Sequence, residues 1–157
     1  MDPSPAVEPF VRVLCLSGPN LQLLGRREPH IYGAENLETI HQRLRSRASE
    51  LGATIETKQS NHEGDLLDWM GEAPSSFDGV LLNPGALTHT SIALYDAIKA
   101  TCLPYVEVHL SNPDAREEFR RHSWIAPACI GRIAGFGAMS YLLALDGLVN
   151  VVRTRKS

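Results

Sequence analysis

The sequence alternates between short apolar runs of strand length and longer segments with helical periodicity. The apolar runs lie at residues 11–16, 80–82, 105–109 and 130–134, and residues 54–59 show the alternation of a further strand. Strands that alternate with helices form parallel sheets with right-handed crossovers, and the helices then cover both faces. The chain is therefore expected to be an α/β protein, a flavodoxin-like three-layer sandwich. Its five-stranded parallel sheet is expected to have the order 2-1-3-4-5.

The expected helices follow from apolar side chains at helical spacing. Asn36 can cap a helix that continues until Gly52 stops it. Further helices are expected around residues 66–70 and 94–98, and a last one at residues 139–151. Across 157 residues and 17.2 kDa, we expect one catalytic domain at residues 11–152, preceded by a flexible tail at 1–10 and followed by a tail at 153–157.

Composition excludes several classes of function. A net charge of −3 and a pI near 6.0 argue against nucleic acid or an anionic membrane surface as the partner. No apolar run approaches the roughly 20 residues of a membrane span. The acidic, proline-rich start lacks the pattern of a signal peptide.

The cysteines indicate that the protein lies in a reducing compartment, and the histidines give no sign of a metal site. Cys15, Cys102 and Cys129 are far apart and odd in number, so buried free thiols in the cytoplasm are expected. The six histidines show no metal-type spacing, so no metal site is predicted. His41, with two other histidines, is expected at the surface.

Uncharged polar and imidazole groups follow the strands where each one ends. They are Asn20, Arg27 and Tyr32 after the first strand, Asn61 and His62 after the second, Asn83 and His89 after the third, and His109 and Ser111 after the fourth. Ligands of open α/β sheets bind outside the carboxyl ends of the strands. Asn61 and His62 are expected only to cap a helix. The long connection at residues 17–33 has a glycine- and proline-containing tip that could form a lid.

The segment 104–121 brings an acid and an anion-binding set together. His109 ends a strand, and a short charged helix capped by Asn112 or Asp114 is expected next. Arg116 and Arg120 are four residues apart, so they would share one face of that helix. Taken alone, these charges could equally be a solvated surface.

Known nucleotide and nucleophile motifs are missing from the sequence. There is no GxxxxGK[ST], no GxSxG, and the Gly135-Phe136-Gly137 run lacks the third glycine of a dinucleotide loop. None of the three lysines follows a strand end in a way that suggests a Schiff base. The chemistry that remains is acid–base catalysis without a cofactor.

Five motifs together resemble the type II 3-dehydroquinate dehydratases. They are SGPNLQLLGRREPHIYG, QSNHEG, NPGALTHTSIALYDA, EVHLSN and AREEFRRHS, in collinear order within residues 11–145. The resemblance implies a flavodoxin-like homododecamer built from trimers. It also implies the removal of water from 3-dehydroquinate to give 3-dehydroshikimate, without metal or cofactor, in the shikimate or quinate pathway.

The resemblance also implies catalytic roles. Tyr32 would take the C2 proton, and Arg27 would favour its phenolate. His109, backed by Glu107, would protonate the departing C1 hydroxyl, and Asn20 would stabilise the enolate through a water. A tyrosine has an ordinary pKa of about 10, so a neighbouring guanidinium is needed to make it a base at neutral pH.

Further positions match residues that bind the substrate. They are Asn83, His89, Asp96 (from a neighbouring subunit), Leu110, Ser111 and Arg120, with Arg116 in support of the lid or interface. The sequence departs from the usual family residues at Ser17, Tyr95, Asp114 and Trp124.

Two alternatives stay open at this point. Tyr32 could be a loop aromatic that packs over the sheet edge. The whole chain could be a non-catalytic flavodoxin-like module that binds a small carboxylate or phosphate, which needs the arginines and asparagines but no reactive tyrosine.

Overall fold

The computed structural model describes residues 7–26, 28–32 and 35–157. Arg27, one of the residues expected in the site, lies outside the described residues. For Tyr32 the backbone is described and the side chain is not. The long connection after the first strand contains a 3-10 helix, η1 (Leu21–Leu23), and a short helix, α1 (Pro29–Tyr32).

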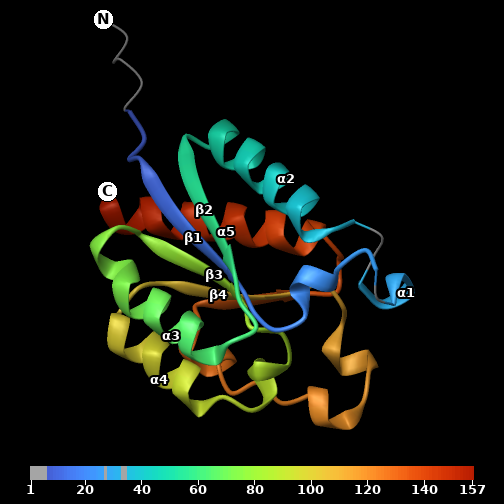
Figure 1. Cartoon of the computed structure of the whole chain (residues 1–157). Helices are drawn as coiled ribbons and strands as arrows, with labels where there is room; N and C mark the ends of the chain where they lie inside the picture. Colours follow the sequence, from blue (N-terminus) through green and yellow to red (C-terminus); the bar gives the residue numbers. More distant parts are fainter. Residues whose placement is uncertain (1–6, 27, 33–34) are drawn as a thin grey trace, which may run out of the picture.

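All five expected strands form one parallel sheet. They are β1 (Val11–Ser17), β2 (Ala53–Gln59), β3 (Gly79–Asn83), β4 (Tyr105–His109) and β5 (Gly131–Ala134). The strand order is β2-β1-β3-β4-β5, so the predicted fold is confirmed. The carboxyl ends of the parallel strands meet at one end of the sheet, and the start of β1 and the carboxyl end of α5 lie at the other end (Figure 1).

The longer helices form the outer layers of the sandwich. They are α2 (Leu37–Glu50), α3 (Glu63–Glu72), α4 (Ile92–Thr101) and α5 (Met139–Lys156). Helices α2 and α5 cover one face of the sheet, and α3 and α4 cover the other (Figure 1). The caps follow the sequence: the Asn36 side chain accepts from the Thr39 N–H at 2.8 Å, and Ser91 accepts from Leu94 at 3.0 Å.

The pleat of β1 divides its side chains between two cores. Val13 and Cys15 belong to the core under α2 and α5, whereas Leu14 and Leu16 belong to the core under α3 and α4. All four are essentially fully buried. Successive side chains of a strand point to opposite faces, so a strand buried on both sides is a continuous apolar run. This is why the central strands were recognisable in the sequence.

The chain end differs from the sequence expectation, because residues 153–156 belong to α5 rather than to a tail. Arg153 donates to the Leu51 carbonyl, and Lys156 donates to the Phe10 carbonyl at 3.0 Å and pairs with Asp78 at 3.1 Å. These bonds attach the last turn of α5 to the amino-terminal end of the sheet, which extends the helix beyond the expected stop.

The prediction of a charged helix after β4 is wrong. The chain forms two separate 3-10 helices instead, η4 (Pro113–Ala115) and η5 (Glu118–Arg120). Arg116 and Glu117 between them have extended backbone angles, which interrupt any helix. Asn112 caps η4 as expected, by accepting from the Asp114 N–H at 3.1 Å. Arg116 and Arg120 therefore do not share a helix face.

Two further expectations are corrected by burial. His41 is buried, at 7% exposure, because α2 turns it toward the protein rather than toward solvent. Cys102 is exposed at the carboxyl end of α4, whereas Cys15 is buried, and all three cysteines are free thiols. None of the helices in the described ranges is long and apolar enough to cross a membrane.

The loops after β1 and β3 touch each other through two glycines. Gly18 donates to the Asn83 carbonyl at 2.8 Å, and a Cβ at Gly18 would lie 2.6 Å from the Pro84 oxygen. Gly85 has a φ of +60°, and a Cβ there would lie 3.0 Å from the Pro19 oxygen. Only residues without a side chain allow the two backbones to approach this closely.

Replacing Gly18 by alanine should therefore destabilise the protein. The added methyl group would meet backbone, which cannot rotate away, so we expect a loss of about 1–3 kcal/mol in the free energy of unfolding. Urea unfolding measures this loss. Gly147→Ala is the matched control: a Cβ there meets nothing within 4 Å on the exposed side of α5, so the same change should stabilise by about 0.5–1 kcal/mol. Equal effects at the two positions would contradict the close approach.

Candidate active site

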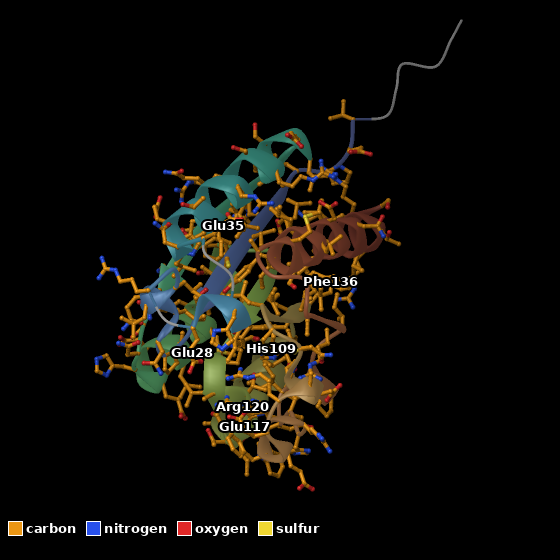
Figure 2. All side chains as sticks on the ribbon, turned by 90° about the vertical axis from the view of Figure 1, so that its right-hand side faces the viewer. Glu28, Glu35, His109, Glu117, Arg120 and Phe136 are labelled. Carbon is orange, nitrogen blue, oxygen red and sulfur yellow. The ribbon has the colours of Figure 1, made fainter. Side chains whose placement is uncertain are left out.

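A cavity of about 110 Å³ lies at the carboxyl ends of the strands. Its walls include eight of the residues expected in the site: Asn20, Asn83, His89, His109, Leu110, Ser111, Arg116 and Arg120. Pro19 and three leucines of the loop after β1 complete the apolar part of the wall. Figure 2 looks toward this end of the molecule, with His109, Arg120 and Glu117 near its centre.

His109 at the end of β4 is held by a buried carboxylate. Its Nε2 lies 2.5 Å from Oε2 of Glu107, two residues earlier on the same face of the strand. Glu107 is 0% exposed and receives two more donors: Ser123 Oγ donates to Oε1 at 2.7 Å, and Arg132 Nε donates to Oε2 at 2.8 Å. Three donors from three segments thus satisfy one carboxylate.

These donors keep Glu107 ionised in spite of its burial. Burial acts to raise the pKa of the carboxyl group, but the hydrogen bonds from His109 and Ser123 and the positive charges of His109 and Arg132 outweigh it. The pKa of Glu107 is therefore lowered from its ordinary value. An ionised carboxylate can only accept, so His109 Nε2 carries a proton and Nδ1 is the nitrogen that can exchange a proton at the cavity.

Asn83 is fixed by an equally buried network. Its Nδ2 donates to the Tyr141 hydroxyl at 2.9 Å, and its Oδ1 accepts from the Gly85 N–H at 3.2 Å. The Tyr141 hydroxyl also bonds to Ser17 Oγ at 3.0 Å. Burial raises the pKa of Tyr141, so its hydroxyl stays neutral. The amide of Asn83 is thereby held in one orientation at the cavity wall.

His89 has a defined tautomer. Its Nδ1 lies 2.7 Å from the His122 carbonyl oxygen, which can only accept, so Nδ1 carries the proton. Burial and the charges of His109 and Arg120 lower the pKa of His89, against the opposing effect of the bond to His122. The neutral ring then presents Nε2 as a hydrogen-bond acceptor.

The two arginines of the wall are tethered by their neighbours. Arg116 Nη1 donates to Ser111 Oγ at 3.3 Å, and Arg120 Nε donates to Glu117 Oε2 at 2.7 Å. The side chains are only 17% and 18% exposed. Two guanidinium groups on one small cavity favour an anionic ligand, such as a carboxylate.

Asn20 is held in position by Asn61, which the sequence predicts only as a helix cap. It adopts a left-handed conformation, with a φ of 70°, and its N–H donates to Asn61 Oδ1 at 3.0 Å. Asn61 also accepts from Gln59 Nε2 at 3.2 Å. The segment after β2 therefore supports the loop after β1, and Asn61 holds the backbone of Asn20 in addition to its place before α3.

Among the expected residues whose side chains are described, Asp96 lies apart from the cavity and its hydrogen bonds. It is exposed on the outer side of α4. The exposed side chain of Ile92 lies one helical turn before it, so the two share a face. A contribution from Asp96 would have to reach a neighbouring subunit.

Three residues that contact the site were missed by the sequence reasoning: Ser123, Arg132 and Tyr141. Arg132 carries a detectable signal, because a charged residue interrupts an apolar strand and stands opposite Glu107 in the pairing of β4 with β5. Ser123 and Tyr141 carry none, since each approaches the site through a distant loop or helix.

The arrangement can move a proton beside a bound anion. It combines an imidazole on a buried carboxylate, a neutral imidazole acceptor, a fixed amide and two cations. Within residues 7–26, 28–32 and 35–157, no three or more histidine, cysteine or acidic side chains cluster closely enough to hold a metal ion.

The sequence and the fold both have well-described relatives. The sequence matches the family Dehydroquinase class II over residues 11–149. A 3-dehydroquinate dehydratase of Synechococcus is 54% identical, covering 91% of this chain and 97% of the relative. One of Rhizobium johnstonii is 54% identical, covering 88% and 96%. The crystal structure of a type II dehydroquinase from Butyrivibrio crossotus has a TM-score of 0.87 at 41% identity, covering 88% and 97%.

The lowered pKa of Glu107 predicts how its contribution to stability depends on pH. The folded pKa lies below the ordinary value of 4.5, so the ionised carboxylate stabilises the folded state above about pH 4.5. That contribution is lost as the pH falls through the folded pKa. The free energy of unfolding of wild type should therefore exceed that of Glu107→Gln by an amount that shrinks below about pH 4.5.

Urea unfolding at pH 7, 5, 4 and 3, at one protein concentration, measures this difference. Glu56→Gln is the control, because Glu56 is an exposed carboxylate on β2 whose ion pair with Lys58 is at the surface. A gap for Glu107→Gln that stayed constant or widened on acidification would contradict the assignment of a stabilising buried carboxylate.

Proposed function

The chain belongs to the class II dehydroquinase family and is a 3-dehydroquinate dehydratase, and we propose that its reaction uses Tyr32 as base and His109 as acid. The observation that carries this proposal is the pairing of His109 with the ionised Glu107 at a cavity lined by two arginines. A non-catalytic binding module is set aside, because relatives that align over nearly their whole length are enzymes of this name.

The first step removes the proton at C2, next to the C3 ketone. The electron pair moves onto the ketone oxygen and gives an enolate, whose charge Asn20 stabilises through a water. Tyr32 takes the proton as phenolate, and Arg27 lowers the cost of that charge because a guanidinium remains protonated in almost any setting. The position of Asn20 on the cavity wall supports its part in this step.

In the second step the enolate electrons return and expel the C1 hydroxyl. His109 Nδ1 gives its proton to the departing oxygen, so that water leaves and a C1=C2 double bond conjugated to the ketone forms. Glu107 stabilises the imidazolium before transfer and holds the ring through Nε2. One proton is taken and one is given, so two side chains suffice and we propose that no metal or cofactor takes part.

Substrate binding follows from the remaining wall. Arg120, with Ser111 and the backbone of Leu110, would hold the carboxylate of 3-dehydroquinate, and Arg116 supports Ser111 from behind. The acceptor nitrogen of His89 and the fixed amide of Asn83 suit the ring hydroxyls, which both donate and accept.

We also propose an oligomer built from trimers into a dodecamer, located in the cytoplasm. The exposed face of α4 with Ile92 and Asp96 supports a contact between subunits. Free thiols support a reducing compartment, and burial raises the pKa of Cys15 and of Cys129 to about 12, which keeps those two thiols unreactive. Supply of shikimate and breakdown of quinate both fit this reaction.

Tyr32→Phe tests the base. Removing the hydroxyl should lower turnover of 3-dehydroquinate by at least about 10²-fold, followed by the ultraviolet absorbance of the conjugated enone. Tyr105→Phe is the matched control, since Tyr105 is buried at the start of β4 and its hydroxyl makes a long bond of 3.5 Å to Thr101. Near-normal turnover in Tyr32→Phe would remove Tyr32 from the mechanism.

Mixed oligomers test the role of Asp96. If Asp96 serves a neighbour's site, inactive Tyr32→Phe subunits mixed with inactive Asp96→Ala subunits should recover activity after dissociation and reassembly. Some sites then combine an intact Tyr32 with a neighbour's intact Asp96. Sedimentation should also give a mass many times 17.2 kDa. An active monomer, or no recovery in the mixture, would show that each subunit completes its own site.

A further inference from the structure

Arg132 occupies an unusual position beside the proposed acid. It lies on the edge strand β5, directly opposite Glu107 in the strand pairing, and its side chain is 27% exposed. Its Nε donates to Oε2 of Glu107, the same oxygen that accepts from His109 Nε2. A guanidinium and an imidazole thus share one carboxylate oxygen, while Ser123 occupies the other.

The geometry is poor for stability alone. Arg132 donates only one N–H to Glu107, and its Nη2 is buried without a hydrogen-bond partner in the described part of the chain. A buried donor without a partner lowers the stability of the fold. Arginine forms its strongest pairs with a carboxylate through two parallel N–H bonds, and Arg132 does not bind Glu107 in this bidentate way. Although its hydrogen bonding is incomplete, Arg132 places a permanent positive charge beside Glu107.

That charge acts on His109 through the shared oxygen. A carboxylate bonded to imidazole favours the charged imidazolium and makes it a weaker acid. A second cation on the same oxygen offsets part of the negative charge and repels the imidazolium directly. The imidazolium therefore gives up its proton more readily than it would with Glu107 alone.

We propose that Arg132 is a positioning residue that tunes the acid strength of His109 by partly neutralising Glu107. This inference deepens the proposed function and, in its catalytic part, rests on it. An acid whose pKa lies near the working pH transfers its proton best, so the arginine sets the balance between holding and releasing the proton. With a neutral residue at position 132, His109 would hold its proton more strongly and transfer it more slowly.

Other charged or titratable groups face His109 and also affect how readily it gives up its proton. They are Glu107 on β4, Arg132 on β5, His89 at the end of η3 (Gly85–His89), Arg116 after η4 and Arg120 on η5. Cys129 faces Glu107, and its thiol is neutral because burial raises its pKa. Only Arg132 among these groups bonds to the same oxygen as His109, so its removal should have a distinct effect.

The test measures the titration of His109 directly. Protein with 13C-labelled histidine is titrated by NMR, and the His109 signal is assigned by its loss in His109→Gln. Arg132→Gln keeps an N–H donor without the charge and should move the NMR titration of His109 to higher pH. Arg132→Lys keeps the charge and should titrate as wild type does. Arg12→Gln removes a cation at the amino-terminal end of the sheet and should change nothing.

The kinetic readout is the pH profile of kcat/KM for 3-dehydroquinate. The high-pH limb, where the acid loses its proton, should move upward in Arg132→Gln by the same amount as the NMR titration, with a lower rate in the plateau. Arg132→Lys should restore the wild-type profile. Thermal unfolding of each variant confirms that the fold is retained, and Arg132→Met serves as the uncharged variant if Arg132→Gln does not fold.

The outcomes separate this inference from the proposed function. An unchanged His109 titration in Arg132→Gln, or equal shifts in the Gln and Lys variants, would overturn the role of Arg132 whatever the enzyme kinetics show. A shifted titration with an unmoved kinetic limb would keep the electrostatic role of Arg132 and would instead remove His109 from its place as the acid.

Discussion

The site depends on one buried charge, the carboxylate of Glu107. A charge with no solvent exposure is stable only when donors surround it, and this one draws its donors from β4, β5 and the loop after η5. The same bonds that satisfy the carboxylate fix the ring of His109 and join β5 to the site. Stability and reactivity therefore share the same atoms, and the edge strand is part of the functional structure.

A second constraint comes from the loops after β1 and β3. Gly18 and Gly85 let the two backbones approach closely, which brings Asn20 and Asn83 to one cavity. The buried hydroxyl of Tyr141 then holds Asn83, and Asn61 holds the loop that carries Asn20. Each polar residue on the wall has a partner behind it, so the cavity is organised before a ligand enters.

The helix periodicity and strand runs predicted the fold in the right order, because burial on both faces of a parallel sheet leaves a strong apolar signal. The prediction erred where polar contacts outweigh periodicity. The charges from Arg116 to Arg121 looked helical, yet extended angles at Arg116 and Glu117 split the segment into two turns. Likewise α5 continues to Lys156, because its last cationic side chains bond to carbonyl groups and to Asp78.

The sequence by itself determined the sheet order, the strand ends and the family, since apolar spacing and local motifs are properties of neighbouring residues. It also placed Glu107 and His109 on one face of a strand through the two-residue period. Only the tertiary structure decided what surrounds them. Ser123, Arg132 and Tyr141 reach the site from segments that are 16, 25 and 58 residues away from their partners. The charge that interrupts β5 marks Arg132 in the sequence without indicating its partner, and nothing local marks Ser123 or Tyr141, because these contacts exist only once the sheet and its loops are packed.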